Sequence, residues 1–392
     1  MAAKIFHNRL FYVIFLLIGA AIIRFGLMGM LEQGNNVWLR IGDVMIILSI
    51  GVFILRGTAN IIEETTDVLH ERTKLAGGLL QSLGTAFPDM VLGVVAAVMS
   101  LKVRSTDYLL SINFAIIAAA TTFGSNIYNI GHAVWSLFRQ NLANKRGKSI
   151  LMFPGIKKGG NVKPISEHPV KPSLNELDTA IEIINALTVL TAAVAVSMVI
   201  FGQIKKPIAG INGDLYQFIR PAGFVIFLMS IFIIYRFRKT ERSQSPVEEI
   251  VEEEKYYKTK SSMVIWFNLL IAGAAILLTA EIMVRAIETF CDISGLPFII
   301  AGVLAGMIGC LGEMIVVHNF VIHPKGRVGD AVVGVAMDNV ITVLGASVVA
   351  MMGGIFLGGN ALILIFVIIL TLNGTLIWQI SNLKNSLFIA RK

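Results

Sequence analysis

The stretch LAGGLLQSLGTAFPDMVLGVVAAVMSL, residues 75–101, decides how this chain folds. It is long enough to cross a hydrocarbon core of about 30 Å as a helix, yet Asp89 lies near its middle. A charge at that depth costs at least ~2.5–3.5 kcal/mol on insertion scales, so such residues are rare and usually functional. Pro88 removes a hydrogen bond within the helix, and we expect it to break or kink the helix beside Asp89.

The composition of the whole chain is that of a polytopic membrane protein. Hydrophobic residues make up 55% of it and charged residues only 15%, and its mean hydropathy is +0.76. The strands of an outer-membrane barrel would be short and alternate in polarity, which excludes that class. We therefore predict an all-α membrane protein of about ten transmembrane helices. The helices are predicted at residues 9–30, 38–66, 75–101, 107–138, 180–203, 217–236, 262–290, 294–320, 327–353 and 358–383.

The positive charges predict the orientation and the division of the chain. Lys and Arg gather in the loops on one side, so by the positive-inside rule both termini are expected to be cytoplasmic, and we expect the plasma membrane. The same loops explain the net charge of +8, which does not indicate nucleic-acid binding. We divide the chain into 1–236, an extra N-terminal helix plus the first repeat half; 237–261, a charged cytoplasmic linker; and 262–392, the second half.

A second stretch, SGLPFIIAGVLAGMIGCLGEMIVVHNF at residues 294–320, repeats the pattern of the first. Glu313 stands where Asp89 stands, and Gly309 and Gly312 are expected to loosen the turn before it. One helix later, each copy carries a small polar cluster. The clusters are Gly124-Ser125-Asn126-Ile127-Tyr128-Asn129 and Asp338-Asn339-Val340-Ile341-Thr342. An odd number of crossings separates the copies, which predicts two inverted α-repeats, as in secondary transporters.

Asp89, Glu313 and Asp338 are the residues that we expect to carry the function. No Lys or Arg lies between 74 and 102, 104 and 139, 285 and 325, or 327 and 384. Acids in these helices, without basic partners, must hold protons or bind cations. Hydroxyls of Thr85 and Ser125, with carbonyls freed at the two loosened turns, are the oxygen ligands that Ca²⁺ and Na⁺ prefer.

Three further polar residues have open interpretations. Asn126 and Asn129 are either ligands or partners in hydrogen bonds between helices. Glu281 lies one turn before Arg285, and local pairing with that arginine is expected.

At these residues the chain resembles the calcium/cation antiporter superfamily, which includes the sodium/calcium exchangers. That family carries two inverted α-repeats, each with a Gly-Thr-Ser-x-Pro-Glu element and, one helix later, a Gly-Ser-Asn-x-x-Asn/Asp element. The first repeat matches both, with Ala86 for Ser and Asp89 for Glu. The second repeat keeps Glu313 but has Gly312 for the proline and Thr342 at the last position. The resemblance covers roughly residues 38–380.

The resemblance implies a sodium/calcium exchanger-like fold and a metal-ion site. Asp89 and Glu313 would coordinate Ca²⁺ at the centre. The flanking oxygen ligands would come from Thr85, Ser125, Asn129, Asp338 and Thr342. The backbone carbonyls of Ala86, Gly309 and Cys310 would bind Na⁺. The helix at 9–30 precedes the first family helix and no helix long enough to be the last follows residue 383, so one hypothesis places the extra helix in the vacant position.

We expect a secondary active antiporter that exchanges Ca²⁺ for Na⁺ by alternating access, as the first helix pair of each repeat slides against a rigid core. An H⁺-coupled Ca²⁺ antiporter or a Na⁺/H⁺ antiporter would use the same acids, and an ion channel is a further alternative. A membrane-embedded hydrolase would need a Ser-Lys or His-Glu-x-x-His constellation, which the helices lack. No enzyme activity and no resident cofactor are expected. The partners are the lipid bilayer and inorganic cations, with no nucleic acid; the sequence predicts no oligomeric state.

Overall fold

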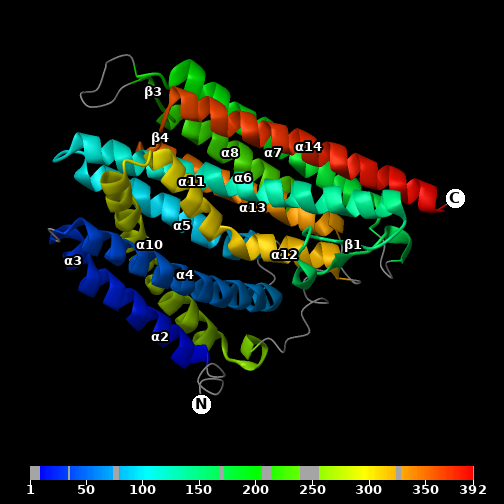
Figure 1. Ribbon diagram of the computed structural model, residues 1–392, viewed down its shortest axis with the longest axis horizontal. Coiled ribbons are helices and arrows are strands. Elements are labelled where there is room, and N and C mark those ends of the chain that lie inside the picture. The colour runs from blue at the N-terminus through cyan, green and yellow to red at the C-terminus, as the bar shows by residue number, and fades with distance from the viewer. Residues whose placement is uncertain are drawn as a thin grey trace.

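The computed structural model shows a bundle of long helices with a small two-stranded sheet at each end (Figure 1). It describes residues 9–33, 36–73, 79–167, 172–204, 213–238, 256–323 and 328–391. The elements up to residue 238 are α2 (Arg9–Ala21), the π-helical turn η1 (Ile22–Leu27), α3 (Met28–Gln33), α4 (Val37–Thr73), α5 (Leu79–Val103), α6 (Tyr108–Arg146), β1 (Ile150–Leu151), η2 (Lys157–Gly159), β2 (Asn161–Val162), η3 (Ile165–Glu167), α7 (Leu174–Phe201), β3 (Leu215–Gln217) and α8 (Arg220–Arg238). The elements that follow are η4 (Tyr256–Thr259), α10 (Ser262–Ser294), α11 (Phe298–Gly309), α12 (Leu311–Ile322), α13 (Val328–Met352), β4 (Phe356–Gly358) and α14 (Gly359–Arg391).

All ten predicted helices are present, and several extend past their predicted ends. The extensions are polar turns outside the hydrocarbon layer, which a hydropathy pattern does not mark. Within the described residues, eight helices are long and apolar enough to cross a membrane, and nine if α11 and α12 count as one bent span. The tenth predicted span is α5, whose apolar part is Met90–Val103. The protein is therefore an all-α integral membrane protein, as predicted. Most of the linker, residues 239–255, lies outside the described residues.

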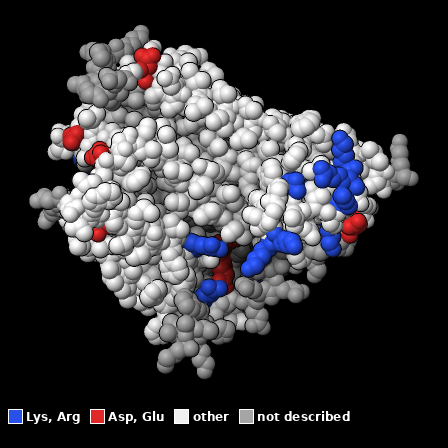
Figure 2. All heavy atoms as spheres, in the orientation of Figure 1, with Lys and Arg blue, Asp and Glu red and all other residues white. Residues whose placement is uncertain are grey.

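The surface carries its charges at its two ends. Lys and Arg gather toward the end that holds β1 and the end of α14, while most of the visible Asp and Glu lie at the opposite end (Figure 2). A broad face without charged atoms lies between them (Figure 2). Large apolar side chains such as Phe232 and Ile363 are 62% and 61% exposed, as expected for side chains that face lipid. We call the end with β1 the terminal side; that this side is cytoplasmic stays a prediction.

The two repeats run in opposite directions through the bundle. At the end of α5, Arg104 Nη1 donates to the Gly353 carbonyl at 3.2 Å, which places that end beside the end of α13 and the β3–β4 sheet. The end of α12, at Ile322, lies instead against Gly160 on the terminal side. The acid-bearing helices of the two copies are therefore antiparallel, as an inverted repeat requires.

The extra N-terminal helix packs against α10 and α4 (Figure 1). Arg24, in the π-helical turn, donates from Nε and Nη2 to the two carboxylate oxygens of Glu281 at 2.9 and 2.8 Å. Glu281 thus pairs with Arg24 through a two-pronged, charge-assisted bond, a partner that the sequence did not indicate. The hypothesis that this helix fills the place of a last family helix stays a prediction.

A buried carboxylate joins the N-termini of two helices. Glu176 is 6% exposed and forms a reciprocal capping box with Ser173 at the start of α7. Its Oε1 also accepts the backbone N–H groups of Gly329 and Asp330, at 2.9 and 3.2 Å, in the first turn of α13. The partial positive charges of two helix N-termini therefore stabilise one carboxylate, and α13 is fixed to α7.

Glu176→Ala would leave the buried N–H groups at both helix starts without their acceptor. We expect this variant to lose about 1–3 kcal/mol of folding free energy, measured as a lower melting temperature in detergent. The matched control is Glu182→Ala, an exposed glutamate on the same helix. Equal shifts in the two variants would contradict the double cap.

Candidate cation site

The candidate site lies where α6 and α11 cross with their backbones almost in contact. A Cβ at Gly306 would lie 2.5 Å from the Thr121 carbonyl oxygen and 2.7 Å from the Ser125 amide nitrogen. On the facing helix, a Cβ at Gly124 would lie 2.7 Å from the Cα of Val303. Small residues permit such close crossings between membrane helices. The crossing brings the last turn of α11 directly beside the polar cluster of α6.

The second repeat is broken beside its acid. Helix α11 ends at Gly309, α12 begins at Leu311, and the two meet at a bend of 56°. Cys310 lies between them with ψ near 5°, outside the helical range, and is fully buried. A helix end can leave carbonyl groups without partners from its own ladder. The Cys310 carbonyl, however, accepts the Met314 N–H at 3.1 Å. The loosened turn predicted from Gly309 and Gly312 is confirmed.

The first repeat behaves differently. The sequence predicted that Pro88 would either break or kink its helix. Helix α5 stays helical through Pro88, so the break does not occur. A proline removes a single backbone bond, and neighbouring helices can hold the segment in place. Ala86 is fully buried in this helix. The side chains of Thr85 and Asp89 lie outside the described residues.

Glu313 lies in the first turn of α12, directly after the break, and is 4% exposed. From α6, Asn129 donates its Nδ2–H to Glu313 Oε2. The start of a helix carries partial positive charge, which favours a carboxylate there. The break, the acid and the amide of α6 thus form one unit that joins the two repeats.

The polar clusters of the two repeats have the same spacing on their helices. Ser125, Asn126 and Asn129 follow an i, i+1, i+4 pattern on α6. Asp338, Asn339 and Thr342 follow the same pattern on α13. At 100° per residue, this spacing gathers each triad into an arc of about 100°. All six are buried, with at most 7% of any one exposed.

The middle amides of the two triads are Asn126, which the sequence left as a ligand or a hydrogen-bond partner, and Asn339, which sequence reasoning missed. Asn126 and Asn339 occupy equivalent positions and are both fully buried. Neither the oxygen nor the nitrogen of either amide has a hydrogen-bond partner among the described residues. Buried polar groups are rarely left this way, because each costs about 1–3 kcal/mol. The shared spacing of the two polar clusters is the sequence signal that could have identified Asn339.

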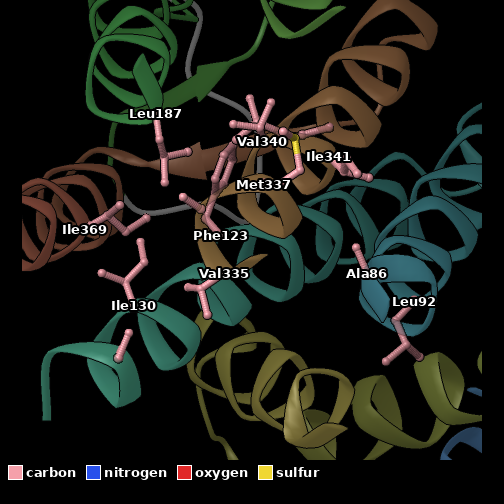
Figure 3. Close-up of a cluster of buried hydrophobic side chains, with 14 of the residues drawn as sticks. Ala86, Leu92, Phe123, Ile130, Leu187, Val335, Met337, Val340, Ile341 and Ile369 are labelled. Carbon is pink, nitrogen blue, oxygen red and sulfur yellow. The ribbon is translucent and has the colours of Figure 1, made fainter. Parts of the chain in front are cut away.

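The opposite faces of α6 and α13 are apolar. Figure 3 shows Met337, Val340 and Ile341 of α13 gathered near Phe123 of α6. Leu187 of α7 and Ile369 of α14 point into the same cluster from the other side (Figure 3). Hydrophobic packing therefore fixes the rotation of both helices, and with it the direction of their polar arcs.

The hydroxyl groups of the predicted site bond within their own helices. Ser125 Oγ donates to the Thr122 carbonyl and Thr342 Oγ1 donates to the Asp338 carbonyl, both at 2.9 Å. A hydroxyl that donates in this way keeps oxygen lone pairs that can still face a cation.

Of the predicted ligands, the structure brings Glu313 together with Asn129 and places Ser125 beside the end of α11. Within the described side chains, no three His, Cys, Asp or Glu residues come together as a metal cluster, so Glu313 and Asp338 are not part of one. The arrangement offers one placed carboxylate, amides and hydroxyls, which is a set of hard oxygen donors.

The fold matches that of a known exchanger over nearly its whole length. The crystal structure of the H⁺/Ca²⁺ exchanger CAX aligns with a TM-score of 0.54 at 12% identity, covering 97% of this chain and 98% of that one. A structure of the sodium-calcium exchanger NCX_Mj soaked with Na⁺ and Sr²⁺ aligns with a TM-score of 0.45 at 14% identity, covering 89% and 98%. No family model and no curated protein matches the sequence. The chain thus has the CAX fold, in agreement with the fold that the motif resemblance implies.

The close crossing at Gly306 predicts a strong effect of the smallest possible side chain. Gly306→Ala should force α11 away from α6, lowering the free energy of unfolding by about 1–3 kcal/mol and displacing the break beside Glu313. Gly273→Ala on α10 is the control, because its Cβ would meet no atom within 4 Å. Thermal unfolding of both variants checks this, and a stable Gly306→Ala would refute the close crossing.

Proposed function

We propose that this chain is a secondary active antiporter of the calcium/cation superfamily that carries Ca²⁺ in exchange for a monovalent cation. The observation that carries the proposal is the buried Glu313, held by Asn129 at the break between α11 and α12. A carboxylate at this depth, in a helix that the sequence supplies with no Lys or Arg, needs a proton or a cation to balance its charge.

We assign the ligands that would share a cation with that acid to both repeats. Glu313 and Asp89 provide the charges, and the resemblance assigns the other positions. These are Thr85, Ser125, Asn129, Asp338 and Thr342 through side chains, and Ala86, Gly309 and Cys310 through carbonyl oxygens. To this set we add the amide oxygens of Asn126 and Asn339. A cation would supply the partner that both amides lack among the described residues.

The mechanism follows from two bodies held together in different ways. The core helices α5, α6, α11 and α13 approach one another closely at small residues, such as Gly345 of α13 against Met90 of α5. Helices α2, α4 and α10 form the second body, in which Arg24 binds Glu281, and Arg72 of α4 bonds backbone carbonyls of η4 just before α10. Sliding of this second body against the core would expose the site to each side in turn. A protein whose site carboxylates have no bound ion would change poorly between the two access states. The change therefore requires one ion or the other to be bound, and this requirement couples the two fluxes.

The identity of the counter-ion is the finer part of the proposal. The family motif led to Na⁺ as the expectation, with H⁺ as the alternative that uses the same acids. The structural neighbour whose fold this chain shares is described as an H⁺/Ca²⁺ exchanger, which supports Ca²⁺ as the cargo.

Purified protein in liposomes should take up radioactive Ca²⁺ against an imposed outward gradient of Na⁺ or of H⁺. Glu313→Gln should reduce this flux at least tenfold, a loss of about 1.4 kcal/mol or more, because the placed charge is gone. Glu167→Gln, which changes an exposed glutamate, should leave the flux unchanged. Full flux in Glu313→Gln would rule out the assigned site.

The two unpaired amides predict opposite effects on stability and transport. Asn126→Leu and Asn339→Leu should each raise the melting temperature of the ion-free protein, because they remove buried polar atoms without partners. Each should also weaken Ca²⁺ transport, because a ligand is lost. Asn319→Leu, at an exposed position of α12, is the control. If both amide variants are less stable and transport normally, the amides serve packing and not the ion.

A further inference from the structure

Two histidines meet on the terminal side of the candidate site. His132 lies on α6, three residues after Asn129, and His318 lies on α12, five residues after Glu313. Their ring centroids are 6.5 Å apart and their planes differ by 30°. Phe153 stacks on His318 at 5.6 Å with an interplanar angle of only 5°. The two rings therefore bridge the same two helices that Asn129 and Glu313 join.

The β1–β2 hairpin covers this pair from the terminal side. Trp135 Nε1 and Arg139 Nε on α6 donate to the backbone carbonyls of Met152 and Leu151, at 3.2 and 3.1 Å. Gly160, at the start of β2, leaves no space for a side chain because Ile322 of α12 lies against it. The hairpin thus spans α6 and α12 between the histidines and the aqueous phase.

Each ring uses one nitrogen and leaves the other unused. His132 bonds the backbone carbonyl of Met314, the residue next to Glu313, and His318 bonds that of Gly159 in the hairpin. His132 Nε2 and His318 Nδ1 are buried and have no hydrogen-bond partner among the described residues. An imidazole that donates to a carbonyl through one nitrogen has a bare lone pair on the other, which accepts a proton.

We propose that His132 and His318 form a proton-binding site beside the cation site and that the counter-ion of this exchanger is a proton. The proposal rests on the proposed function, because it names the ion exchanged for Ca²⁺. A proton from the terminal-side solution binds the lone pair of one ring, which becomes an imidazolium, and the same nitrogen releases the proton to the opposite side after the second body has slid against the core. Its positive charge repels a cation bound at the neighbouring Glu313, so proton and cation occupy the two sites alternately.

The chemistry of the pair favours a proton over other cations. The lone pair of an imidazole nitrogen binds a proton, whereas Na⁺ prefers oxygen ligands. A stable transition-metal site takes three or four ligands, and no three His, Cys, Asp or Glu side chains cluster within the described residues.

Charged and titratable residues occur on several elements around the pair. The basic groups are Arg139 on α6, Lys157 and Lys158 on η2 and Lys384 on α14; the acidic groups are Glu313 on α12, Asp330 and Asp338 on α13 and Asp89 on α5. Neutral titratable groups are Tyr128 on α6, Cys310 before α12 and His323 after it.

The test compares two fluxes in liposomes containing the full chain, without Na⁺. Ca²⁺ self-exchange at equal pH reports the cation site alone, and Ca²⁺ uptake driven by an H⁺ gradient reports coupling. The double variant His132→Gln, His318→Gln should keep self-exchange and lose H⁺-driven uptake at least tenfold. His323→Gln is the control on the same helix segment and should keep both fluxes. His318→Phe keeps a ring against Phe153 and should show the same loss if the Gln variant does not fold.

The outcomes separate this inference from the proposed function. Self-exchange in the wild type together with H⁺-driven uptake that needs the pair supports the proposal. Self-exchange that an H⁺ gradient does not accelerate, or coupling that survives in the double variant and in His318→Phe, overturns it and leaves the antiporter proposal standing. A wild type without either flux, and without Na⁺-driven uptake, overturns the proposed function itself.

Discussion

The structure depends on one constraint, which is that Glu313 is buried in a stretch of the chain that has no Lys or Arg between Arg285 and Lys325. A soluble protein would place an arginine beside such a carboxylate, but here the neighbours are an amide from α6 and the start of α12. These groups orient the carboxylate without cancelling its charge. The close crossing of α6 and α11, the break at Cys310 and the apolar packing of α13 all hold this arrangement in place. A carboxylate buried at this depth is expected to take part in binding a cation or a proton from solution.

Sequence reasoning reached the fold and much of the site because those features follow from local patterns. Helix positions follow from hydropathy, the inverted repeat from two acidic motifs separated by an odd number of crossings, and the break from Gly309 and Gly312. The interruption expected at Pro88 does not occur in α5, because a proline is only one missing bond while its neighbours pack around it. Local rules thus predicted where the backbone is weak, and packing decided whether it breaks.

The remaining features could not be predicted because they join residues far apart in the chain. Glu176 caps a helix that begins 153 residues later, and Glu281 binds a residue 257 positions earlier. Neither partner is marked by a motif, and for Glu281 a nearer arginine offered a simpler pairing. Asn339 and the histidine pair were missed for a related reason. The role of a single amide or imidazole depends on which side chains face it from another helix, and the sequence does not show that. Contacts of this kind require the three-dimensional arrangement.

The pairing of Arg24 with Glu281 has a consequence for how the protein is made. Arg24 enters the membrane well before its partner, which is translated 257 residues later. At about 5–20 residues per second, the ribosome needs tens of seconds to reach Glu281. During that interval a charge that costs about 2.5–3.5 kcal/mol at the centre of a helix has to be tolerated by the insertion machinery or by snorkelling. Assembly of the N-terminal helix is therefore completed only when the second half of the chain arrives, which makes the two halves a single unit of biogenesis.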